Sequence, residues 1–80
     1  MDEGRKFRFV VESDPTEDAL VRLLGPFMVQ QAVVEAVDHA AGETAARTVI
    51  RASRLAREQA ETLTRRLEGL PFVRSVGFGW

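Results

Sequence analysis

The chain contains no cysteine and only one histidine among its 80 residues. The absence of cysteine excludes a disulfide framework, thiolate metal ligands and a cysteine nucleophile. A single histidine cannot form a metal site unless carboxylates complete the ligand set. The remaining residues show no catalytic constellation and no cofactor motif. We therefore expect a protein that is not an enzyme and that carries no cofactor and no metal.

The chain also lacks an excess of charge of one sign and a long apolar run. Eleven basic residues are balanced by twelve acidic ones, which gives a formal net charge of -1. Such a balance provides no positive field that would attract nucleic acid or an anionic membrane. There is neither a signal-peptide core nor an apolar run of about 18 residues. These absences predict a cytoplasmic protein with no nucleic-acid partner and no membrane partner.

The composition is that of an ordinary folded domain, with 45% hydrophobic and 29% charged residues. We expect one domain over residues 5–80, after a frayed segment at residues 1–4. A chain of this size buries only about 60% of its unfolded surface, so its core is thin. A partner subunit would help to stabilise such a domain.

Apolar spacing in the first half predicts a strand followed by a helix. Residues 6–12 alternate in polarity, and the apolar face of this strand is Phe7, Phe9 and Val11. Asp14 is placed to cap a helix and Pro15 suits its first position. Pro26 interrupts the helical pattern because it removes a backbone hydrogen bond. Since the apolar stripe continues past it, we expect a kinked helix that reaches about Val29 or Gln30.

The second half predicts two strands, a helix and a last strand. The second strand covers residues 32–38, with one face formed by Val33, Glu35 and Val37 and the other by Ala32, Val34, Ala36 and Asp38. Gly42 is available for a positive φ in the hairpin that leads to the third strand, residues 44–52. A leucine-rich helix follows, and its apolar stripe is Ala56, Ala60, Leu63, Leu67 and Leu70. Gly69 ends this helix, and residues 72–78 form the last strand.

This order predicts an α+β fold, the ferredoxin-like βαββαβ sandwich. Right-handed crossovers place both helices on one face of a four-stranded antiparallel sheet. The second strand then lies at an edge of the sheet and is apolar on both faces, which an exposed edge normally avoids. We therefore expect a homodimer that forms through the edge of the second strand.

The run from Ala19 to Phe27, followed by Gln30 to Glu35, resembles the first helix and second strand of ACT domains. The resemblance is strongest to the small regulatory subunits of acetolactate synthase, in which A-L-x-R, two apolar residues and G-x-F lead into an x-G-x-N-I-x-S strand. It implies a non-catalytic regulatory domain or small accessory subunit that binds an amino acid or a similar small effector at a homodimer interface. It also implies a catalytic enzyme subunit of amino-acid biosynthesis as a partner.

In that family the ligand contacts come from the loop after the first strand and from the junction between the first helix and the second strand. In this sequence the matching positions are Ser13, Asp14, Gln30, Gln31, Ala32 and Val33. Gln31 stands where the family has a glycine, and Val33 where it often has an asparagine. A glutamine there could fill the pocket or could itself hydrogen-bond a ligand. The alternative is therefore a structural interaction module with a closed pocket.

Other functions of the same fold have less support in the residues. RNA recognition needs aromatic side chains on the third strand, and residues 44–51 contain none. The loop after the first strand is acidic, which does not suit the binding of an acyl phosphate. His39 is most simply a surface hydrogen-bonding group. Arg47, Arg51, Arg54 and Arg57 are most simply a solvated strip, and Trp80 is a candidate for packing in the core or across a dimer.

Overall fold

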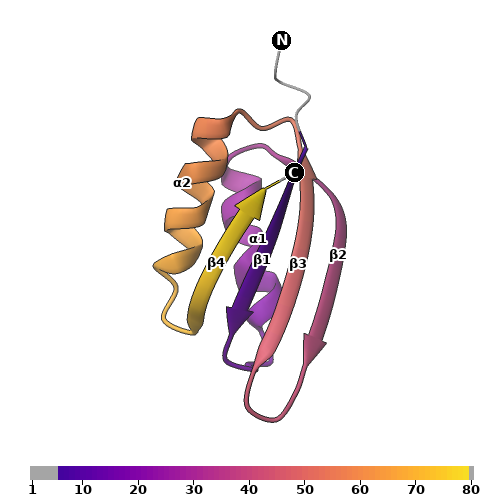
Figure 1. The fold of residues 1–80 in the computed structure, drawn as a ribbon, viewed down its shortest axis with the longest axis vertical. Coiled ribbons are helices and arrows are strands. Elements are labelled where there is room, and N and C mark those ends of the chain that lie inside the picture. The colour runs from indigo at the N-terminus through magenta and orange to yellow at the C-terminus, as the bar shows by residue number, and fades with distance from the viewer. Residues whose placement is uncertain (1–5, 80) are drawn as a thin grey trace.

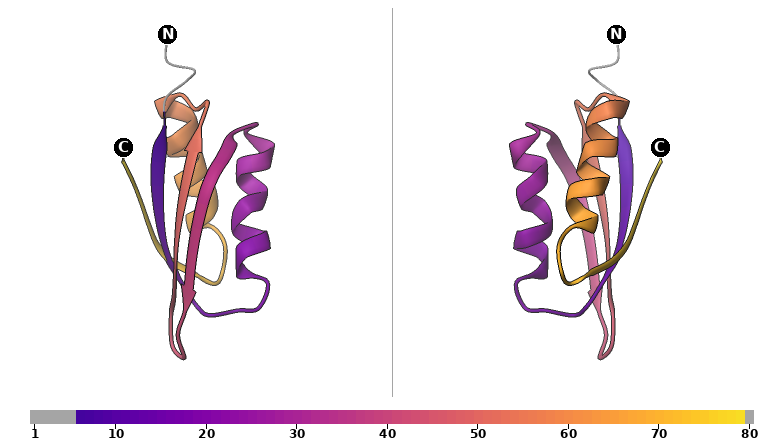
Figure 2. Two further views of the ribbon diagram at one scale, coloured as in Figure 1. Left: turned by 90° about the vertical axis from the view of Figure 1, so that its right-hand side faces the viewer. Right: turned by 90° about the vertical axis from the view of Figure 1, so that its left-hand side faces the viewer.

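The computed structural model describes residues 6–79. Its elements follow one another as β1 (Phe7–Ser13), α1 (Ala19–Val29), β2 (Val33–Ala41), β3 (Ala46–Ser53), α2 (Arg57–Glu68) and β4 (Val73–Gly79). The strands form one antiparallel sheet in the order β2-β3-β1-β4, so β2 and β4 are its edges. Both helices cover the same face of the sheet (Figures 1 and 2). The predicted ferredoxin-like fold is confirmed.

The core lies between the sheet and the two helices. Phe7, Phe9 and Val11 of β1 are buried on the helix side, as their alternation predicts. The Phe9 ring meets Phe27 of α1 edge to face, with ring centroids 5.0 Å apart and planes at 89°, an arrangement that aromatic pairs favour. The other large buried apolar side chains of the core are Leu23, Ile50, Leu55, Leu63, Leu67 and Phe72.

The predicted start of the first helix at Asp14 and Pro15 is wrong. α1 begins at Ala19, and Asp18 occupies the N-cap position without a side-chain cap hydrogen bond. The Asp14 carboxylate is bound instead by Arg74 of β4, at 2.7 Å. A charge-assisted bond of this kind is stronger than a neutral one. The Asp14 carboxylate therefore binds Arg74 and does not cap the helix.

The predicted end of the first helix is confirmed. α1 continues through Pro26 and ends at Val29. Pro26 cannot donate a backbone hydrogen bond, yet its own carbonyl oxygen accepts one from the Gln30 amide at 3.1 Å. The helical turn around the proline is therefore closed on its C-terminal side.

The predicted alternation along the second strand is wrong because β2 contains a β-bulge. The pairing with β3 shifts between Val34 and Ala36, which makes Glu35 the extra residue. An extra residue reverses the side to which the following side chains point. Val34 and Val37 therefore both pack against the core, although the sequence pattern places them on opposite faces.

The β2–β3 hairpin turns later in the sequence than predicted. β2 extends to Ala41 and β3 begins at Ala46, and the Gly42 amide donates to the Ala45 carbonyl oxygen at 2.8 Å. The predicted positive φ at Gly42 is wrong, since no glycine among residues 6–79 has a positive φ. His39 binds Thr48 across the hairpin, Nδ1 to Oγ1 at 2.8 Å, in keeping with a surface hydrogen-bonding role.

The second helix follows its predicted pattern. Ala60, Leu63 and Leu67 are buried, and Gly69 follows its last turn. Neither helix in residues 6–79 is long and apolar enough to cross a membrane. The expectations for residues 1–4 and for Trp80 lie outside the described residues.

Candidate functional site

The first predicted site segment, Ser13 and Asp14, is held by contacts within the chain. Ser13 is fully buried, and its hydroxyl donates to the Asp14 carbonyl oxygen at 3.1 Å. The Asp14 amide donates to the Phe72 carbonyl oxygen at 2.8 Å. The carboxylate atom Oδ1 of Asp14 accepts from Nε and Nη2 of Arg74, at 2.9 and 2.7 Å. These contacts hold the loop in place, and the Asp14 carboxylate is already paired with the Arg74 guanidinium.

The second predicted segment begins where α1 ends in a Schellman motif. The Ala32 amide donates to the Phe27 carbonyl oxygen and the Gln31 amide to that of Met28, both at 3.0 Å. These are the two bonds that define this type of helix end. Its left-handed residue is Gln31, with a φ of 60°. A side chain in this conformation costs about 1 kcal/mol, so the position favours glycine for a backbone reason.

Gln30 and Gln31 line a hollow of about 390 Å³ together with Arg54 and Gln59. Arg54 also has a positive φ, 64°. The two non-glycine residues with positive φ in the described chain thus border the same hollow, and strained backbone of this kind clusters at binding sites. The Gln59 atom Oε1 already accepts from the Ala56 amide at 2.8 Å. The glutamine NH₂ groups and the Arg54 guanidinium remain as donors for an anionic group.

Arg54 and Gln59 were not among the residues predicted for the site. Arg54 follows β3 and Gln59 lies in the first turn of α2, so neither is close in sequence to the helix–strand junction. The sequence shows a basic residue at position 54 but not its left-handed backbone. The backbone conformation of Arg54 could not be predicted from the sequence, since an arginine is not a residue type that indicates a positive φ.

The two predicted segments lie at opposite ends of α1 (Figure 1). Ser13 and Asp14 precede the helix, and the segment from Gln30 to Val33 follows it. A helix of 11 residues is about 16 Å long, at a rise of 1.5 Å per residue. A single copy of the chain therefore does not bring the two segments into contact with one small molecule.

One flank of α1 is apolar and exposed. Val21 and Met28 are 75% and 72% exposed, and with half-buried Leu24 they share one side of the helix by their spacing. Arg22 lies on the other side, where its guanidinium stacks on the Phe72 ring at 4.8 Å. The flank formed by Val21, Leu24 and Met28 therefore points away from Phe72 and toward the edge strand β2. Val33, at the start of β2, is a further exposed apolar residue there.

The likeness of this chain to known proteins lies in its structure and not in its sequence. No protein-family model matches it, and no curated protein matches its sequence. The ACT domain of the GTP pyrophosphokinase of Chlorobium tepidum matches its structure with a TM-score of 0.82 and 9% identity, over 95% of this chain and 99% of that one. This chain has the same fold as that ACT domain.

Two further solved structures share this fold. The C-terminal domain of the MgtC protein from Mycobacterium tuberculosis gives a TM-score of 0.79 at 14% identity, over 99% of this chain and 89% of that one. An uncharacterized protein from Thermotoga maritima gives 0.74 at 14% identity, over 96% of both chains. Because proteins with different names share this scaffold, the fold alone does not determine the function, which depends on the residues of the site.

Proposed function

We propose that this chain is an ACT-like regulatory domain that binds an amino acid or a similar small effector at the interface between two copies of itself. The observation that carries the proposal is the free β2 edge beside the exposed apolar flank of α1. Val21 and Met28 at this flank have no packing partner in one copy that covers them. A second copy would bury them and would pair the open strand edge at the same time.

The geometry of such a pair explains why the two predicted segments are far apart in one chain. Two copies that join antiparallel at β2 are related by a two-fold axis perpendicular to the sheet. Their α1 helices then lie side by side in opposite directions. The loop with Ser13 and Asp14 of one copy therefore comes to the same end as the segment from Gln30 to Val33 of the second copy. Each pair contains two equivalent sites.

The side chains at this junction suit a ligand that carries a carboxylate. Gln30, Gln31 and Arg54 supply amide and guanidinium donors, and guanidinium binds a carboxylate with two parallel hydrogen bonds. An ammonium group on the same ligand would be placed near the loop of the other copy, where Asp14 shares its charge with Arg74. An amino acid fits this division of charge.

The finer hypothesis concerns the enzyme that the domain regulates. The run from Ala19 to Phe27 resembles the regulatory subunits of acetolactate synthase, which supports a partner enzyme of amino-acid biosynthesis. An effector acts on such a partner only through its different affinities for two arrangements of the subunits. Addition of the protein to a purified acetolactate synthase catalytic subunit, with and without the effector, would measure this.

The second candidate is a structural interaction module whose pocket is closed. Two observations favour it. Arg74 already neutralises Asp14, and Gln31 places a side chain where the backbone favours glycine. In this case the apolar flank still pairs two copies or docks onto an enzyme, but no effector enters the junction.

A thermal-shift screen against the twenty amino acids, combined with a solution mass, separates these candidates. A ligand that binds only the folded state raises the apparent stability in a concentration-dependent way. We expect a mass of two chains and a rise with a small subset of the amino acids, which Arg54→Gln reduces. A dimer that responds to no amino acid would support the interaction module. A mass of one chain at tens of micromolar would contradict the paired site.

A further inference from the structure

The sheet face that the helices leave uncovered has an unusual pair of arginines. Because Phe7 and Phe9 point to the helices, Arg8 between them points to the open face. Arg8 of β1 lies directly opposite Arg51 of β3. Like charges directly opposite each other in a sheet are destabilising. Two rows further along the same face the facing charges are opposite in sign, since Glu12 forms an ion pair with Arg47 at 3.6 Å.

The positive charge of this arginine pair is not balanced within the described chain. Among residues 6–79, no acidic side chain forms an ion pair with Arg8 or with Arg51. Lys6 lies nearby and is paired with Glu35 at 3.6 Å. Both arginines are exposed, so their repulsion is reduced by water, but no acidic side chain among residues 6–79 relieves it.

Two glycines lie beside the arginines on the same face. Gly79 and Gly77 of β4 are opposite Arg8 and Val10 of β1. Neither glycine has a positive φ, and a Cβ added to either would meet nothing within 4 Å. The backbone and the packing of this chain therefore do not require glycine there. Glycine in a strand is unfavourable and often marks the close approach of a ligand or of another backbone.

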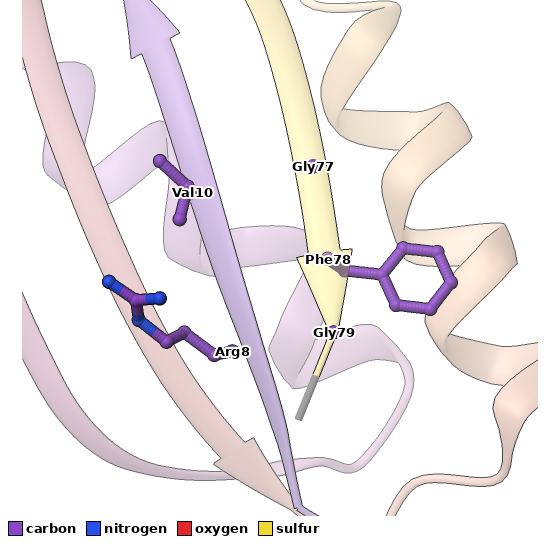
Figure 3. Close-up of a pocket in the computed structure, with 5 residues that line it drawn as sticks. All are labelled: Arg8, Val10, Gly77, Phe78 and Gly79. Carbon is purple, nitrogen blue, oxygen red and sulfur yellow. The ribbon is translucent and has the colours of Figure 1, made fainter.

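The arginines and glycines border two adjacent hollows. The first, of about 290 Å³, is lined by Arg8, Val10, Gly77, Phe78 and Gly79. Figure 3 shows Arg8 extending from β1 toward β3, while the two glycines leave the floor over β4 without side chains. The second hollow lies on the other side of Arg8 and is lined by Lys6, Phe7, Glu35 and Arg51 besides it. The size of the first is at the lower end for small-molecule sites, which start at about 300 Å³.

We propose that the open sheet face binds a small organic dianion at Arg8 and Arg51, with the carbon skeleton of the ligand over Val10 and Gly77. Each guanidinium donates two parallel hydrogen bonds to a phosphate or carboxylate group. A dianion neutralises both arginines and removes the repulsion between them. A phosphate monoester and a dicarboxylate share this chemistry, and the experiment below distinguishes them.

The same features argue against nucleic acid as the ligand. Val10 and Val49 occupy the central row of this face, so the described strands offer no aromatic platform on which bases stack. The site lies on the face opposite to the helices and is separate from the Gln30–Val33 junction. The proposal for this site therefore does not depend on the proposed effector function.

The test is a titration of the ¹⁵N-labelled 80-residue protein, followed by amide chemical shifts, with glycerol 3-phosphate, succinate and inorganic phosphate. We expect saturable shifts that centre on the amides of Arg8, Val10, Arg51 and Gly77. Arg8→Gln and Arg51→Gln should each weaken binding at least roughly tenfold, because a charge-assisted pair is lost. Arg66→Gln on α2 removes the same charge elsewhere and should leave the affinity unchanged. Preference for glycerol 3-phosphate or for succinate identifies the anionic group.

A second variant tests the role of the glycine floor. Gly77→Val places its side chain in open space, so the fold is retained, but the side chain occupies the hollow. It should weaken the organic dianions and leave inorganic phosphate, which has no carbon skeleton, nearly unaffected. The proposal is overturned if none of the three anions gives saturable shifts. Shifts spread over the arginines of α2, or an equal loss of affinity in Arg66→Gln, would overturn it as well.

Discussion

Arg74 binds Asp14 through two nitrogen atoms and so joins β4 to the loop that precedes α1. Its Nε and Nη2 atoms lie 2.9 and 2.7 Å from Oδ1 of Asp14, and Nη2 also donates to the Thr44 carbonyl oxygen at 2.7 Å. One side chain thus connects the loop, the last strand and the segment that leads into β3. Both partners are about half exposed, so water screens the pair.

Loss of this connection should cost little stability but should loosen the loop. We expect Arg74→Met to lower the free energy of unfolding by about 0.5–1 kcal/mol, the range of a well-formed exposed ion pair. Urea denaturation at constant m value measures the change. Arg66→Met is the matched control, because the Arg66 guanidinium forms no ion pair with an acidic side chain among residues 6–79, and it should change stability by less than about 0.5 kcal/mol. Equal effects of the two variants would contradict the role of the pair.

The left-handed conformation of Gln31 predicts that glycine is better than glutamine at this position. Gln31→Gly removes the strain of a side chain at a φ of 60°, and we expect the protein to become more stable by about 0.5–1 kcal/mol. Gln30 is the matched control, because its φ is -82°. Gln30→Gly should instead lower stability by about 0.5–1 kcal/mol, since it only adds freedom to the unfolded chain. Thermal or urea unfolding with the same sign for both variants would show that Gln31 is not strained.

The bulge in β2 predicts that one residue of the strand can be removed. Deletion of Glu35 restores one-to-one pairing with β3 and keeps Val34 and Val37 on the core side. It should lower stability by no more than about 1 kcal/mol, the worth of the exposed ion pair with Lys6. Circular dichroism and urea unfolding measure this.

The control for that deletion is Val49 in β3, which is paired regularly on both sides. Its removal moves every later residue of the strand to the opposite face, and we expect no cooperative folding. If removal of Glu35 were as damaging as removal of Val49, then β2 would not contain a dispensable residue.

The sequence predicts the core well because burial follows simple periods. The alternation of Phe7, Phe9 and Val11 and the helical spacing of Leu63 and Leu67 depend only on which face is apolar, and all five are buried. Where a second interaction competes with the local pattern, the prediction made from the sequence is wrong. Asp14 does not cap the helix because its carboxylate binds a guanidinium 60 residues away in the sequence. The alternation in β2 is interrupted by a bulge that no residue type predicts.

The candidate site was less predictable than the core. The resemblance to ACT domains names positions at both ends of α1, but their separation in one chain only becomes visible in the fold. Arg54 enters the junction hollow through a positive φ, which its residue type does not indicate. Arg8 and Arg51 become neighbours through the register of β1 and β3, and register depends on pairing between segments that are far apart in sequence.

The exposed flank of α1 gives the last prediction, which concerns self-association. Met28 is 72% exposed in one copy, so Met28→Glu should not disturb the core or the fold of the monomer. In the proposed pair this side chain faces the other copy, and burying an unpaired carboxylate there is costly. We therefore expect Met28→Glu to weaken the dimer at least roughly tenfold, which corresponds to about 1.4 kcal/mol, as measured by sedimentation equilibrium. Thr62→Glu adds the same charge on α2, away from the β2 edge, and should leave the dimer intact. If Met28→Glu and Thr62→Glu had the same effect on self-association, the partner would not be seated on this flank.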